Sequence, residues 1–300
     1  MTTYRGVRLI LLLALAVVGV APVATSAASV ASPPAEALAP SNTLYLPIIR
    51  KPLACPATSG RSYGSGIMYQ FDNDNPVRPA WNHADKNLDL RGYSLTTGTK
   101  GLIDVGRDAG ETAQPPQLKT LFSPARVPTF PNVYRVNNWN WGTSPAPGTR
   151  GTPITNPGVT LISMQTTAGE ELHAPTHGRN IGDDFGQGGS MVIYADANSI
   201  AIHYTREDTA ANGYTVHVDN ICTDPNLLAL YNSLDNAARN TYSSSRPYGY
   251  NLPGLTAGKV FGTARSGEIF VALVDSGAFM DPRSCKEFWF WEVPAGGPCP

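Results

Sequence analysis

The 300-residue sequence has few charged side chains and no excess of either sign. Its 22 lysines and arginines nearly balance 23 aspartates and glutamates, so charged residues make up 15% of the chain and the formal net charge is −1. Binding to nucleic acids depends largely on basic side chains that neutralise phosphates. The composition therefore argues against a nucleic-acid partner. The 29 glycines and 26 prolines instead favour an extracellular, β-rich protein with many turns.

Long apolar runs are also scarce, and the one clear run stands at the N-terminus. Residues 9–20 are apolar, follow Arg5 and Arg8, and precede the small residues at 24–28. This pattern is typical of a signal peptide, and the run falls short of the ~20 residues that a membrane-spanning helix needs. We therefore predict a signal peptide over residues 1–28. The protein would be secreted, extracytoplasmic, and in contact with the membrane only through this peptide.

A stretch rich in proline, alanine and serine follows at residues 29–60. Such a composition is typical of a linker, which we interpret as a tether that spaces the globular part from the membrane or wall. The rest of the chain is long enough for one large domain or two small ones. We predict a β-rich N-terminal region of unknown type over residues 61–158 and a second β domain over residues 159–300.

The sequence has only four cysteines, and they lack the closely spaced Cys-x-x-Cys pairs of a zinc knuckle. In an exported protein they are expected to form structural disulfides. Cys285 with Cys299 would fasten the C-terminus, and the aromatic residues 288–291 would pack beside that bridge or form an exposed patch. The spacing alone leaves all three connectivities open for Cys55, Cys222, Cys285 and Cys299.

Alternation of apolar and polar residues predicts several strands. They cover residues 132–136, 159–164, 189–194, 199–204, 213–218, 259–263 and 268–274. A polar turn joins the fourth of these to the fifth, which predicts a hairpin. One helix is predicted from Asp224, a capping residue followed by Pro225, to Arg239. The predicted fold class is therefore mainly β, with an antiparallel sheet, hairpins and one short helix.

Five segments of the second region follow the order of motifs in the lysostaphin/LytM-type zinc peptidases, which are murein DD-endopeptidase-like enzymes. The closing segment, residues 268–277, keeps the apolar alternation and the turn of that family's last strand, and an Asp-Pro pair follows it. The other four lie at residues 176–181, 195–200, 231–234 and 258–262. The chain thus resembles this family over residues ~160–285. The resemblance implies a LytM-like β-sheet core.

The residues that the resemblance aligns with the family's active site differ from those of an active enzyme. The zinc ligands would fall on Thr176, Asn180 and Phe270. The catalytic histidines would fall on Ser233 and Glu268. Zinc requires three good protein donors to hold an activated water, and phenylalanine supplies none. The resemblance therefore implies a degenerate pseudo-peptidase without zinc or another cofactor, whose former groove binds peptidoglycan or a protein of the cell envelope.

A rearranged metal site is the second hypothesis. Histidine and carboxylate donors gather at His173, His177 and Asp183, and His217 on a predicted strand would complete a zinc-binding set. The chain would then be a zinc-dependent murein endopeptidase. A lone imidazole on an alternating strand is more often a packing residue, however. We therefore favour a binding protein over an enzyme.

Tryptophans beside asparagines suggest a third hypothesis. Trp139 and Trp141 lie two residues apart, a spacing that places two side chains on one face wherever the chain is extended. Flat apolar rings next to amide donors suit a polysaccharide, and Trp81 likewise has Asn82 and His83 beside it. The alternative is that these rings belong to the core. On the third hypothesis, the chain is a carbohydrate-binding surface protein.

Overall fold

The computed structural model describes residues 52–68, 80–105, 115–143, 146–176, 189–204, 213–241, 250–294 and 296–300. All of them belong to one compact unit, residues 49–300. The predicted signal peptide and most of the predicted linker lie outside the described residues. Among the described helices, none is both long enough and apolar enough to cross a membrane.

The described elements are mostly short strands. The helices are α1 (Leu88–Arg91), α2 (Pro225–Thr241) and α3 (Cys285–Phe288), and the 3-10 turns are η1 (Ala80–Asn82) and η2 (Leu118–Leu121). The strands are β1 (Gly64–Met68), β2 (Tyr93–Thr96), β3 (Val133–Asn140), β4 (Thr149–Pro153), β5 (Leu161–Gln165), β6 (Glu171–His173), β7 (Ser190–Ala195), β8 (Ser199–Tyr204), β9 (Tyr214–Asp219), β10 (Ile221–Thr223), β11 (Tyr250–Leu255), β12 (Val260–Ala264), β13 (Glu268–Asp275) and β14 (Ala278–Phe279).

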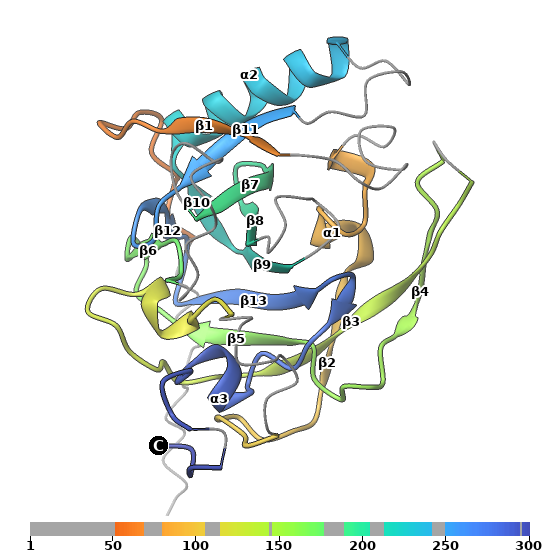
Figure 1. Ribbon diagram of the computed structural model, residues 1–300, viewed down its shortest axis with the longest axis vertical. Helices are drawn as coiled ribbons and strands as arrows, with labels where there is room; N and C mark the ends of the chain where they lie inside the picture. Colours follow the sequence, from red (N-terminus) through yellow and green to blue (C-terminus); the bar gives the residue numbers. More distant parts are fainter. Residues whose placement is uncertain are drawn as a thin grey trace, which may run out of the picture. The chain divides into compact units, whose positions relative to one another are not determined.

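Eleven of the described strands form one antiparallel sheet (Figure 1). Its main path runs β1-β11-β7-β8-β9-β13-β5-β3-β2, while β14 pairs with β13 and β4 with β3. The other three form a smaller antiparallel sheet in the order β10-β12-β6. The prediction of a mainly β, antiparallel fold is confirmed.

The large sheet runs across residue 158, the boundary between the two regions predicted from the sequence. Strand β3 pairs with β5, and β1 pairs with β11. Val133 and Val136 of β3 are buried in cores that residues from later strands help to build. Residues 61–158 and 159–300 therefore share one sheet, because the early strands bury their apolar side chains against the later ones.

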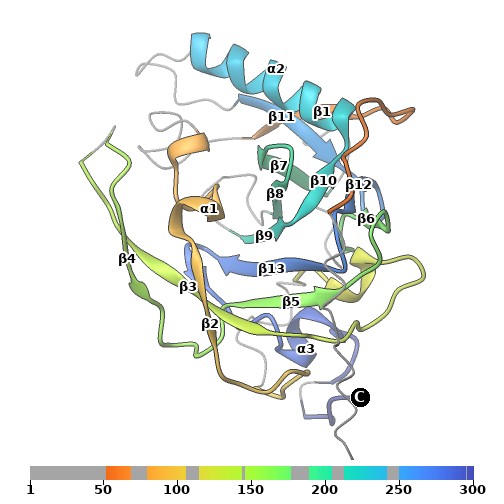
Figure 2. The ribbon, with the colours of Figure 1, turned by 180° about the vertical axis from the view of Figure 1, so that it is seen from behind.

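The predicted hairpin and helix are both present. The hairpin is the pair β8–β9, in register from Ser199 opposite Asp219 to Tyr204 opposite Tyr214, and its turn lies outside the described residues. Helix α2 begins after Asp224, whose Oδ1 accepts a hydrogen bond from the Asn226 amide at 2.9 Å. It lies along β11 in both views (Figures 1 and 2).

Apolar side chains cover both faces of the large sheet. Ile269, Val271 and Leu273 of β13 belong to the larger core, whereas Phe270 and Ala272 of the same strand belong to a smaller core with Leu88 of α1. Successive side chains of a strand point to opposite faces, so the two cores lie on opposite sides of the sheet. The smaller core supports the candidate site described below.

Two disulfides join parts of the described chain. Cys55–Cys222 links the segment before β1 to β10, and Cys285–Cys299 links α3 to the C-terminal segment. The second pairing is the one that the sequence suggested for the C-terminus. Phe288 and Trp289 are fully buried, so these aromatic residues pack into the core rather than forming an exposed patch.

Candidate functional site

Two of the five tryptophans are exposed, and both are connected to helix α1. Trp141, directly after β3, has 46% of its surface exposed, and Trp81 of η1 has 53%. The buried ring of His83 meets the Trp141 ring edge-on, with 5.4 Å between centroids. The Arg91 guanidinium lies 6.0 Å from the same indole. We call Trp81, His83, Arg91 and Trp141 the aromatic face.

The short helix α1 positions this face. The Asn87 side chain caps the helix, because its Oδ1 accepts a hydrogen bond from the Asp89 amide at 3.0 Å. The same side chain donates from Nδ2 to the carbonyl oxygen of Trp81 at 3.3 Å. One asparagine therefore links the start of α1 to the backbone of an exposed tryptophan.

Arg91, at the end of α1, is held from several sides. Its Nε donates to the carbonyl oxygen of Ala84 at 2.9 Å, and one terminal nitrogen contacts a carboxylate oxygen of Asp85 at 2.5 Å. From β3, the Asn137 side chain donates to the Arg91 carbonyl oxygen at 2.9 Å. Side chains fixed in this way lose little conformational entropy when a ligand binds.

Trp139 has a different role from Trp141. Its indole Nε1 donates to the carbonyl oxygen of Pro147 at 2.6 Å, across the connection between β3 and β4. Gly148, with φ +93°, follows, and a Cβ there would lie 2.4 Å from the Asn140 carbonyl oxygen. Trp139 is thus a structural residue of the hairpin, and Trp141 is the one of the predicted pair that is largely exposed.

A buried polar layer lies beneath the aromatic face. The Arg91 guanidinium is 5.0 Å from the Phe279 ring, which in turn stacks on the His217 ring at 6.4 Å. Asp219 follows His217 on the same face of β9, opposite Ser199 of β8. Three side-chain atoms of this layer are buried without a hydrogen-bond partner in the structure: His217 Nε2, Asp219 Oδ2 and Ser199 Oγ.

Burial controls the charge of this layer. It lowers the pKa of His217 to about 3, helped by the positive charge of Arg91 and by His203. Burial also raises the pKa of Asp219 well above its usual value, and Asp89 and Asp196 add to that shift. At neutral pH the imidazole is therefore uncharged and packs between its neighbours. It is a poor base for catalysis, because its proton affinity is too low.

The structure brings together two of the five residues predicted for the degenerate groove. Glu268 and Phe270 alternate along one face of β13. The Phe270 ring packs against the rings of Tyr93 and Tyr134, with 5.6 Å between centroids in each case. Phe270, which the resemblance aligns with a zinc ligand, is therefore half-buried between two other aromatic rings.

Two other predicted groove residues, Thr176 and Ser233, have contacts elsewhere in the described chain. The Thr176 amide donates to Thr120 Oγ1 at 2.8 Å, next to η2. Ser233 is exposed on α2, which packs on β11 and β7. No described contact joins either residue to Phe270, and Asn180 lies outside the described residues. The groove that the resemblance implies stays a prediction.

The alternative metal set is also only partly described. His173 lies on β6 of the smaller sheet, with its Nδ1 2.9 Å from the Gly258 carbonyl oxygen. His217 lies on β9 of the larger sheet, and His177 and Asp183 are outside the described residues. In the part of the chain that the structure describes, histidine, cysteine and carboxylate side chains form no group of three that could hold a metal ion.

Sequence reasoning missed two residues of the site. Asp219 stands two positions after His217 on a predicted strand, and that spacing could have identified it as a neighbour on the same face. Arg91 had no such signal, because only the fold brings α1 onto Trp141 and Phe279.

Comparison of the whole chain with protein-family models, with curated proteins and with solved structures found no match.

Proposed function

We propose that this chain is an exported, non-catalytic protein that binds a cell-envelope polysaccharide through its aromatic face. The observation that carries the proposal is the exposure of Trp81 and Trp141 on a surface whose backbone and neighbouring side chains are hydrogen-bonded in place. An indole combines a flat apolar surface with a polar N–H group. Such a ring suits the apolar face of a sugar, and the buried His83 and Arg91 side chains support the Trp141 ring from behind.

Peptidoglycan is the polysaccharide that we favour, because the chain resembles murein peptidases. The non-catalytic assignment rests on the resemblance, which aligns a zinc ligand with Phe270, a side chain that offers no donor to a metal. Two disulfides support an oxidising compartment outside the cytoplasm. Secretion through the predicted signal peptide and retention at the cell surface by residues 29–60 belong to this proposal.

Retention on insoluble peptidoglycan, chitin and cellulose particles tests the proposal. Trp141→Ala and Trp81→Ala are each expected to weaken retention on the bound polymer by about tenfold, as for a residue that contributes much of the binding energy. Leu95→Ala is the matched control, since Leu95 of β2 is 67% exposed and lies outside the aromatic face. Unchanged retention in both tryptophan variants would overturn the proposal.

The same particles test the enzyme hypothesis. Release of soluble peptidoglycan fragments by the zinc-loaded protein, blocked by a chelator, would favour a zinc endopeptidase over a binding protein.

A further inference from the structure

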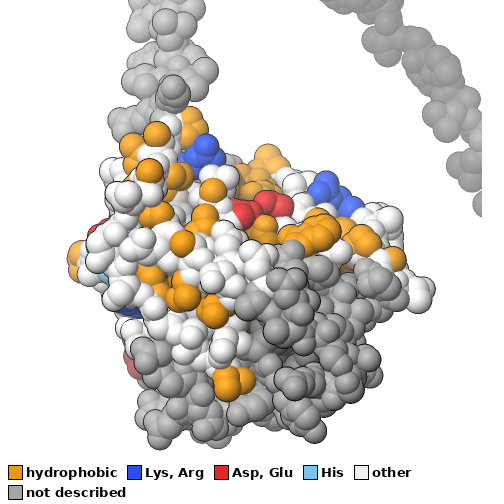
Figure 3. Space-filling model, turned by 90° about the horizontal axis from the view of Figure 1, so that it is seen from above, with side chains coloured by type: hydrophobic (Ala, Val, Ile, Leu, Met, Phe, Trp, Pro, Cys, Tyr) orange, Lys and Arg blue, Asp and Glu red, His pale blue; other side chains and the backbone are white. Residues whose placement is uncertain are grey.

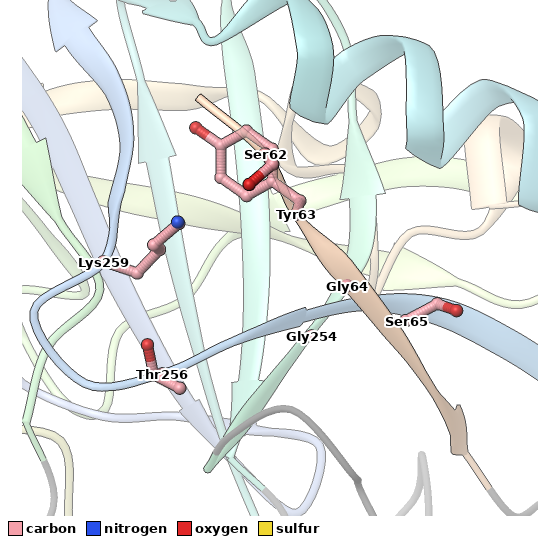
Figure 4. Close-up of a pocket in the computed structure, with 7 residues that line it drawn as sticks. All are labelled: Ser62, Tyr63, Gly64, Ser65, Gly254, Thr256 and Lys259. Carbon is pink, nitrogen blue, oxygen red and sulfur yellow. The ribbon is translucent and has the colours of Figure 1, made fainter. Parts of the chain in front are cut away.

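A polar hollow lies at the other end of the large sheet, beside β1 and β11 (Figure 4). It encloses about 380 Å³, within the range of small-molecule sites. Among the described residues at the end of the molecule that carries α2 and β1, few charged side chains are seen (Figure 3). The hollow is lined by Ser62, Tyr63, Gly64, Ser65, Thr256 and Lys259.

Lys259 supplies the one positive charge of this lining. The backbone fixes its position, because the Lys259 amide donates to the Thr256 carbonyl oxygen at 3.0 Å and the Lys259 carbonyl oxygen accepts from Ala174 at 2.8 Å. Its ammonium lies 5.2 Å from the centroid of the Tyr63 ring and is directed toward it (Figure 4). Tyr63 is fixed in turn, since its hydroxyl donates to the Val260 carbonyl oxygen at 2.9 Å.

No described carboxylate neutralises Lys259. The acidic side chains whose charges act on Tyr63 are Asp224 and Glu171, and both form ion pairs with Arg61. The ammonium of Lys259 has no ion pair among the described residues, so it is available to an anionic ligand.

The number of donors indicates which anion fits. A phosphate dianion is usually held by several charged or backbone donors together, such as an arginine fork or a helix N-terminus. Here the lining has a single ammonium, that of Lys259, which can balance one negative charge of a ligand. The hydroxyls of Ser62 and Thr256 line the same hollow and can form hydrogen bonds with other polar groups of that ligand. A carboxylate attached to a ring that carries hydroxyl groups meets these requirements.

We infer that this hollow binds an acidic sugar, with the carboxylate on Lys259 and sugar hydroxyls on Ser62 and Thr256. The inference goes beyond the aromatic face and does not depend on it. The sugar acid is either free or a unit of an acidic polysaccharide, and the test separates these sources.

Titration of the purified protein with galacturonate, galactose, inorganic phosphate and polygalacturonate, followed by calorimetry at low ionic strength, tests the inference. Galacturonate is expected to bind at least fivefold more tightly than galactose or phosphate. Lys259→Ala should remove this preference and Lys259→Arg should retain it. Lys100→Ala is the control, because Lys100 is exposed and contacts Asn132 instead.

Tighter binding of polygalacturonate than of the monomer would identify a polymer unit as the ligand, and equal binding per site would identify the free sugar acid.

Three results would overturn the inference: galactose binding as tightly as galacturonate, phosphate binding more tightly, or Lys259→Ala binding galacturonate normally. An unchanged circular dichroism melting curve would show that Lys259→Ala folds. Trp141→Ala should bind galacturonate like the unmodified protein, so failure of the aromatic-face proposal would leave this result unaffected.

Discussion

His217 and Asp219 are neighbours on β9 whose charged forms are both disfavoured by burial. Their effects on stability have opposite dependence on pH. The pKa of His217 is about 3 in the folded protein, against 6.5 for an ordinary histidine. Between these two values the unfolded chain binds a proton on this histidine and the folded chain does not. The free energy of unfolding therefore falls as the pH drops from about 6.5 toward 3. Asp219, with its raised pKa, keeps a proton that the unfolded chain releases above pH 3.8. Its contribution to stability therefore falls as the pH rises from about 4.

The Asp219→Asn variant isolates the second effect. An asparagine is neutral at every pH. It therefore removes the loss of stability that arises near neutral pH because the unfolded chain releases the Asp219 proton and the folded chain keeps it. The increase in melting temperature over the unmodified protein should therefore be larger at pH 7 than at pH 4. Thermal unfolding followed by circular dichroism at both pH values measures it. An equal difference at both pH values would show that Asp219 titrates normally, and Asp275→Asn at the end of β13 serves as the control.

Individual residues were predicted from the sequence with mixed success. Trp141 was a candidate because of its neighbours in the chain, and it is exposed as a binding residue requires. Trp139 has similar neighbours in the sequence, but its indole donates a hydrogen bond to the Pro147 carbonyl oxygen. Pro147 is eight positions away, and no alternation pattern reveals that contact. The packing of Phe270 between Tyr93 and Tyr134 was equally hidden, because it depends on strands far apart in the sequence.

At the scale of elements, the β3–β4 hairpin presents the tryptophans, and its connection depends on Gly148. This residue has φ +93°, and an added Cβ would lie 2.4 Å from one backbone oxygen and 2.7 Å from the Trp139 indole nitrogen. Gly277 has a similar φ of +87° but has open space around its Cβ position. An alanine at Gly277 would therefore experience backbone strain alone, whereas an alanine at Gly148 would experience the same strain and a steric clash.

Gly148→Ala is expected to destabilise the protein by about 2–3 kcal/mol, and Gly277→Ala by about 1 kcal/mol, because only the first adds a clash to the strain. Urea unfolding of both variants measures the difference. Equal losses would mean that the hairpin connection relaxes around the new methyl group. Gly148→Ala should also weaken polysaccharide retention, since it displaces the segment that carries Trp141.

Elements with a strong local signal were predicted well. The α2 helix has a cap and an apolar stripe within its own sequence, and β8 and β13 are apolar over most of their length. The four-residue helix α1 was missed, because its single cap, Asn87, is followed by too few residues to show a period. Such short elements are determined by tertiary contacts, and α1 is the one that places Arg91.

At the scale of the whole molecule, the two disulfides close loops of very different length. Cys55 and Cys222 are 167 residues apart, and Cys285 and Cys299 are 14 apart. In the chain-entropy model, the longer loop restricts the unfolded state more, by about 5 kcal/mol against about 3 kcal/mol.

Replacing Cys55 and Cys222 by alanine should therefore lower the free energy of unfolding more than replacing Cys285 and Cys299. Urea denaturation of the two double variants gives the comparison. A larger loss at the C-terminal bridge would indicate that packing around the buried Phe288 and Trp289, rather than loop closure, dominates its effect.

The connection between the two halves of the chain could not be predicted from the sequence. Alternation identifies β3 and β5 as strands but contains no information about which strand lies beside which. The division at residue 158 followed a run of glycine and proline, and the sheet continues on both sides of that run.

The place of β13 in the sheet has a consequence for the order of folding. This strand lies between β9 and β5 although it comes near the end of the sequence, and β11, which pairs with β1, is also late. The β1 edge of the sheet cannot close until Leu255 has emerged, and the middle of the sheet cannot close until Asp275 has emerged. Pairings between distant segments form slowly, so a nascent chain would lack its complete sheet, and stay open to proteases and self-association, until its last strands arrive.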